Sequence, residues 1–79
     1  MNIKVLGSGC TNCKKLLEHV NLAVDMAEID AEVDYVTDFM EIAKYNLMRT
    51  PGLVINQKVV SFGKVLKPVE IVNLINENK

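Results

Sequence analysis

The chain of 79 residues has no tryptophan, two prolines, one histidine and two cysteines, and its charges nearly balance. Nine basic and ten acidic residues, with no cluster of lysine and arginine, do not provide the positive surface that nucleic-acid binding requires. No stretch approaches the roughly 18 consecutive apolar residues of a membrane-spanning helix. Two cysteines also cannot form the disulfide framework of a small secreted domain. We therefore expect no nucleic-acid partner, no membrane span and no disulfide scaffold.

The first residues, Met1 to Gly7, contain no basic segment followed by a long apolar stretch, so they do not resemble a signal peptide. We accordingly expect a cytoplasmic protein. The length fits one small domain over residues 1–79, which would bury only about 60–65% of the surface exposed in the unfolded chain. We expect this domain to act as a monomer.

Apolar residues recur with strand or helix spacing in seven segments, which predict the element order βαβαββα. The expected strands are residues 3–6, 31–36, 53–55 and 59–60, and the expected helices are residues 11–28, 38–45 and a last one that begins at Pro68. Residues 31–36 alternate apolar and acidic side chains, as at the edge of a sheet. A right-handed crossover followed by a terminal hairpin predicts an α/β fold with a four-stranded mixed sheet covered by helices.

Local signals mark the ends of these segments. Asp38 followed by Glu41 resembles a capping box at a helix start. Asn46 can adopt the left-handed conformation that ends a helix. Asn56-Gln57-Lys58 between two apolar runs predicts a hairpin, although Gln57 replaces the usual glycine.

Both cysteines lie in Gly9-Cys10-Thr11-Asn12-Cys13, where the first strand gives way to the first helix. The start of a helix carries about half a unit of positive charge, which favours a thiolate and makes Cys10 a nucleophile near neutral pH. Cys13 follows one turn later and can close a disulfide. Because so small a loop is a poor general staple, we interpret the pair as chemical rather than structural.

The element order, the Cys-x-x-Cys after the first strand and Thr50-Pro51 before the third together resemble the thioredoxin-like family in its smallest form. Three segments are similar to the small redox-active disulfide proteins of archaea and bacteria: residues 9–15, 45–51 and 54–60. Metal sites also use Cys-x-x-Cys, but its spacing to a hairpin that begins with Thr-Pro is more specific.

This resemblance implies a thiol–disulfide oxidoreductase in which Cys10 attacks and Cys13 resolves. It also implies a cis Thr50–Pro51 bond beside the disulfide, with the Thr50 backbone offering hydrogen bonds to an incoming chain. No metal or organic cofactor is needed, and the implied partners are protein disulfides and a disulfide reductase. The further expected substrate contacts are Gly9, Thr11 and Asn12.

Some residues depart from the larger members of this family. Lys4 stands where thioredoxins keep a buried acid, and Thr11-Asn12 replaces their Gly-Pro pair. An ammonium group near the sulfurs would favour the thiolate, whereas a Lys4 stem that reaches water would not affect them. Gly63-Lys64-Val65 lacks the paired glycine and acid with which glutaredoxins hold glutathione. We therefore expect a protein reductase rather than glutathione as the reductant.

Two other classes of function stay open. A soft-metal carrier holds Cu(I) between two thiolates of a similar motif, but such carriers have the element order βαββαβ. A pure interaction module is the third class. A closed zinc site needs four ligands, and we interpret His19, the single imidazole, as a solvated side chain. We interpret Met26, Met40 and Met48 as packing residues, although Met48 and Arg49 precede Thr50 and could join a partner-contact surface.

Overall fold

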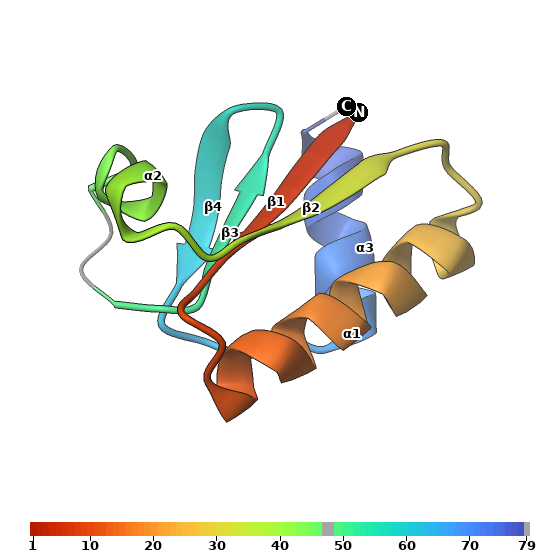
Figure 1. Ribbon diagram of the computed structural model, residues 1–79. Helices are drawn as coiled ribbons and strands as arrows, with labels where there is room; N and C mark the ends of the chain where they lie inside the picture. The colour runs from red at the N-terminus through yellow and green to blue at the C-terminus, as the bar shows by residue number, and fades with distance from the viewer. Residues whose placement is uncertain (47–48, 79) are drawn as a thin grey trace.

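The computed structural model describes residues 1–46 and 49–78, and within them four strands and three helices follow in the order βαβαββα (Figure 1). The predicted order and the α/β class are therefore confirmed. Of the helices in these residues, none is long and apolar enough to cross a membrane. The elements are β1 (Asn2–Leu6), α1 (Thr11–Ala27), β2 (Glu32–Val36), α2 (Phe39–Ala43), β3 (Gly52–Ile55), β4 (Lys58–Phe62) and α3 (Pro68–Glu77).

The strands form one mixed sheet in the order β2-β1-β3-β4. Strand β1 pairs in parallel with β2, and β3 runs antiparallel to both β1 and β4. Strand β2 is an edge strand, with Glu32 and Asp34 exposed, as its alternating sequence predicts. Strands β1 and β3 lie in the centre, which explains why β3 is entirely apolar and buried and why β1 is apolar except for Asn2 and Lys4.

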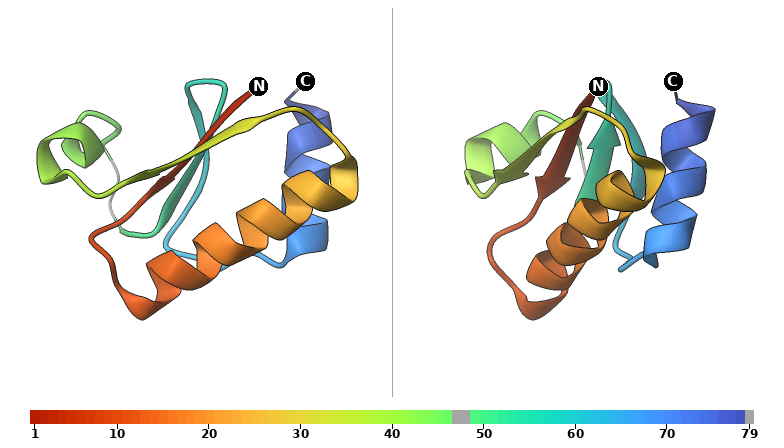
Figure 2. Two further views of the ribbon diagram at one scale, coloured as in Figure 1. Left: turned by 45° about the vertical axis from the view of Figure 1, so that its right-hand side comes forward. Right: turned by 90° about the vertical axis from the view of Figure 1, so that its right-hand side faces the viewer.

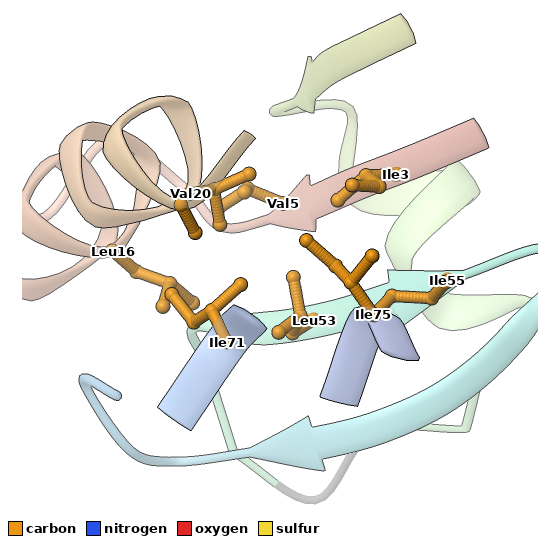
Figure 3. Close-up of a cluster of buried hydrophobic side chains, with 9 residues drawn as sticks. Ile3, Val5, Leu16, Val20, Leu53, Ile55, Ile71 and Ile75 are labelled. Atoms are coloured by element: carbon orange, nitrogen blue, oxygen red, sulfur yellow. The ribbon is translucent and has the colours of Figure 1, made fainter. Parts of the chain in front are cut away.

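Helices α1 and α3 cover one face of the sheet, and α2 lies over the other (Figure 2). Because side chains alternate along a strand, β1 directs Ile3 and Val5 to the first face and Lys4 and Leu6 to the second. On the second face, Leu6 packs with Val54 and Ile42. The larger core on the first face (Figure 3) consists of Ile3, Val5, Leu16, Val20, Ala23, Leu53, Ile55, Ile71 and Ile75.

The local signals are largely confirmed, with two differences at α2. Asp38 caps this helix by accepting a hydrogen bond from the Met40 amide at 2.9 Å, but Glu41 pairs with Lys44 instead of completing the capping box. Helix α2 also ends at Ala43, earlier than predicted, and a turn leads to Asn46 at φ 54°. The hairpin turn has Asn56 and Gln57 at φ 50° and 71°, so Gln57 adopts the left-handed conformation without being glycine.

The pairing of β1 with β2 continues one residue beyond the strand, because the Gly7 amide donates to the Val36 carbonyl at 3.0 Å. Helix α1 begins at this end of the sheet, while the amino terminus and the β3–β4 turn lie at the opposite end (Figure 1). We call the end that holds residues 7–13 the disulfide end of the molecule. The topology therefore brings the Cys-x-x-Cys segment next to the start of β3.

Candidate active site

Cys10 occupies the N-cap position of α1, with an extended backbone at φ −69° and ψ 165°. Its Sγ accepts a hydrogen bond from the Cys13 amide at 3.1 Å, and its carbonyl accepts one from the Lys14 amide at 3.1 Å. Lysine is the single charged residue of the first turn, Thr11 to Lys14, so no carboxylate there opposes the positive helix end. When the pair is reduced, this geometry stabilises a thiolate at Cys10.

Cys13 forms a disulfide with Cys10, and their Cα atoms are 5.0 Å apart. The two side chains differ in exposure: Cys10 is exposed, whereas Cys13 is 0% exposed and belongs to the buried part of α1. An external reactant therefore meets Cys10 first.

Gly7 packs directly against Cys13. A Cβ atom added at Gly7 would lie 2.8 Å from the Cys13 Cβ and would also collide with its Sγ. From the sequence, Gly7-Ser8-Gly9 is expected to be a turn that depends on the flexibility of glycine. In the structure, glycine is needed at position 7 because no side chain fits beside Cys13. Gly9 instead needs the conformational freedom of glycine, because its φ is 89°. No local sequence signal marks the contact between Gly7 and Cys13, because the contact depends on how the end of β1 packs against α1.

The Thr50–Pro51 peptide bond is cis, which is the isomer that the resemblance implies. Gly52 pairs with Leu6 in the β1–β3 ladder, so the register places Pro51 opposite Gly7. Since Gly7 also contacts Cys13, Pro51 and Cys13 flank the same glycine. Pro51 is buried and Thr50 is exposed.

The other expected contact residues lie around Cys10. Gly9 is half-buried, and Thr11 and Asn12 are exposed on the first turn of α1. Arg49 is exposed next to Thr50, whereas Met48 lies outside the described residues. The fold thus brings Gly9, Thr11, Asn12, Thr50 and Pro51 to the disulfide end.

The Lys4 side chain neither approaches the sulfurs nor extends into water, which are the two arrangements considered from the sequence. Its Nζ donates to the Tyr45 hydroxyl at 3.3 Å and lies 5.9 Å from the centre of the Tyr45 ring. This side chain leaves the sheet on the face of α2, whereas α1 and its cysteines cover the other face. Lys4 therefore attaches the segment after α2 to the sheet instead of extending freely into water.

The interpretation of His19 as a solvated side chain is wrong. Its Nδ1 lies 2.7 Å from the Leu66 carbonyl, and the ring is half-buried. Because a carbonyl only accepts, Nδ1 carries the proton in this contact. His19 thus connects α1 to the loop before α3.

Two observations bear on metal binding. Among residues 1–46 and 49–78, no three His, Cys, Asp or Glu side chains are grouped so that they could hold a metal ion. The element order is βαβαββα, not the βαββαβ order of the soft-metal carriers. The topology therefore favours the redox interpretation of the cysteine pair.

Comparison with known proteins extends the similarity beyond the motif. Residues 1–76 match a protein family described as a thioredoxin domain. A thioredoxin of Methanocaldococcus jannaschii is 39% identical over 69 residues, which cover 87% of this chain and 79% of that protein. A thioredoxin of Methanothermobacter thermautotrophicus is 30% identical over 76 residues, which cover 96% of this chain and 99% of that protein.

Proposed function

Because this chain belongs to the thioredoxin domain family and is a thiol–disulfide oxidoreductase, we propose that Cys10 is its attacking thiol and Cys13 its resolving thiol. The difference in exposure between the two sulfurs carries this assignment. Cys10 is exposed at the positive end of α1, whereas Cys13 is fully buried. A target disulfide can therefore approach Cys10. Cys13 is closed to external reactants and lies where it can react with the sulfur of Cys10.

The proposed reaction transfers two electrons from the reduced pair to the target. The Cys10 thiolate attacks one target sulfur, a mixed disulfide forms, and the second target sulfur leaves and takes up a proton. Cys13 then loses its proton and attacks the Cys10 sulfur, so that the Cys10–Cys13 disulfide forms and the first target sulfur is released as a thiol. A disulfide reductase supplies the two electrons that restore the dithiol.

The target chain is proposed to lie along Thr50, whose exposed position next to Pro51 leaves its backbone accessible for strand-like hydrogen bonds. Gly9, Thr11 and Asn12 border the path to Cys10. The acting unit is proposed to be a monomeric single domain over residues 1–79, since one chain supplies every one of these positions. A reducing compartment such as the cytoplasm would maintain the dithiol between turnovers.

Partial alkylation of the reduced protein near neutral pH should modify Cys10 about tenfold or more faster than Cys13, because Cys10 is both exposed and favoured as a thiolate. Peptide mass mapping after short exposure to iodoacetamide measures the two rates. The urea-unfolded protein is the control, in which the rates should converge. Faster labelling of Cys13 would reverse the assigned roles.

The oxidised protein should accept electrons from a thioredoxin-type reductase severalfold faster than from glutathione. The physical reason is that Lys64 follows Gly63 where a glutathione site would need a second glycine and an acid. The two rates are measured as NADPH consumption in separate assays. One assay contains a thioredoxin reductase, and the other contains glutathione and glutathione reductase. Equal or faster turnover with glutathione would contradict the preference.

A further inference from the structure

Charge is separated along the molecule even though the net charge is −1. The far end of α1, the turn that follows it and β2 carry five of the ten acidic side chains: Asp25, Glu28, Asp30, Glu32 and Asp34. Cations instead flank the disulfide end, in the first turns of α1, before Thr50 and in the loop between β4 and α3 (Figure 1): Lys14, Lys15, Arg49, Lys64 and Lys67. A target that approaches Cys10 therefore meets several of these cations.

Among these cations, Arg49 is held in place by a particular contact. Its side chain lies against Gly63, where an added Cβ would be 3.1 Å from the Arg49 Cβ and 3.2 Å from its Cδ. Gly63 is also at φ 71°, a conformation that favours glycine. The aliphatic stem of Arg49 thus rests on the backbone of this glycine, which restricts the directions that the guanidinium can take.

The guanidinium of Arg49 is available to a partner. Arg49 is exposed, and within residues 1–46 and 49–78 it takes part in no ion pair. It borders two surface hollows. One, of about 590 Å³, is also lined by Gly63 and Lys64, and the other, of about 650 Å³, by Ser8 and Thr50. A chain that lies along Thr50 therefore passes Arg49.

We propose that Arg49, assisted by Lys64, selects target segments that carry an aspartate or glutamate beside the reactive cysteine. An arginine can bind a carboxylate through two parallel hydrogen bonds, and the same charge disfavours a lysine or arginine at that position of the target. Arg49 is in this view a specificity-determining residue that leaves the sulfur chemistry to Cys10 and Cys13. The inference rests on the proposed function, since the target reaches Arg49 only when it is bound for attack by Cys10.

Three synthetic peptides with the same internal disulfide, flanked by Glu, Gln or Lys, test the inference. The reduced protein should reduce the Glu peptide fastest and the Lys peptide slowest, with a ratio of about two- to fivefold at low salt. This ratio should approach one as the salt concentration rises from about 0.01 M to about 1 M, because the screening length falls from about 30 Å to about 3 Å. Chromatography of quenched samples measures the rates.

Arg49→Gln should lower the Glu-to-Lys ratio by about twofold or more, and Arg49→Lys should retain part of it because the charge remains. Lys58→Gln is the matched control, since it removes one exposed cation at the β3–β4 turn, at the opposite end of the molecule, and should leave the ratio unchanged. An equal loss in both Gln variants would attribute the preference to net charge and overturn the role of Arg49.

Equal rates with the three peptides would also overturn the inference while leaving the redox function intact. Faster reduction of glutathione disulfide than of the Glu peptide would indicate that these cations bind a small anionic disulfide. It would overturn the inference that they select a protein segment. If the unmodified protein reduced none of the peptides, the redox function itself would be refuted, and this inference with it.

Discussion

Cys13→Ser should accumulate covalent complexes with target proteins in cell extract, and Cys10→Ser should accumulate far fewer. In Cys13→Ser, the exposed Cys10 can still attack a target disulfide, but no second thiol is present to release the target. In Cys10→Ser, the remaining thiol is one that is 0% exposed in the folded protein. Non-reducing gel electrophoresis and mass spectrometry identify the complexes, which dithiothreitol should remove.

The same pair of variants separates an exchange protein from a metal carrier. In a carrier, the two sulfurs are equivalent ligands, so both substitutions should weaken Cu(I) binding to a similar degree and neither should capture a protein. The double substitution of both cysteines is the control for non-covalent association. Absence of trapped proteins, together with tight Cu(I) binding by the unmodified chain, would contradict the redox function.

Gly7→Ala should lower the free energy of unfolding of the oxidised protein by about 1–3 kcal/mol, the usual cost of overfilling a packed site. The added methyl group would overlap Cys13, whose backbone is fixed in α1, so either β1 or the helix must shift. Urea unfolding followed by circular dichroism measures the change. Ser8→Ala, a change at the exposed neighbouring residue, should alter the free energy by less than about 0.5 kcal/mol.

The Gly7 variant also tests the placement of Cys13. If the helix shifts to accommodate the methyl group, alkylation of reduced Gly7→Ala should label Cys13 faster than in the unmodified protein. Unchanged stability combined with unchanged labelling would show that the site has more room than the packing of Gly7 against Cys13 implies.

The fold was predictable from the sequence because its segments have clear hydrophobic periods and end at recognisable residues. The buried face of α1 repeats Leu16, Val20 and Ala23 at helical spacing, and these residues lie in the main core. Alternation in residues 31–36 correctly predicted an edge strand, which the structure forms over Glu32–Val36. The active-site segment was likewise visible, since Cys10 and Cys13 are neighbours in sequence as well as in space.

The remaining contacts join residues that are far apart in the chain, and periodicity contains no information about such pairs. Lys4 meets Tyr45 across 41 positions, and His19 meets Leu66 across 47. The Arg49–Gly63 contact depends on the shape of two loops. The sequence therefore predicts none of these contacts, although Lys4 is recognisable as a departure from the family and Arg49 as a possible partner contact.

The position of Cys10 at the N-cap of α1 links the stability of this helix to the oxidation state of the protein. A charged group at a helix N-terminus contributes about 0.3–1 kcal/mol, and only the reduced form can place a thiolate there. For a two-electron couple, this free energy corresponds to about 6–20 mV in favour of the dithiol. Reduction therefore gains a stabilising interaction at the first turn of α1 and oxidation loses it, so any change that loosens this turn also favours the disulfide.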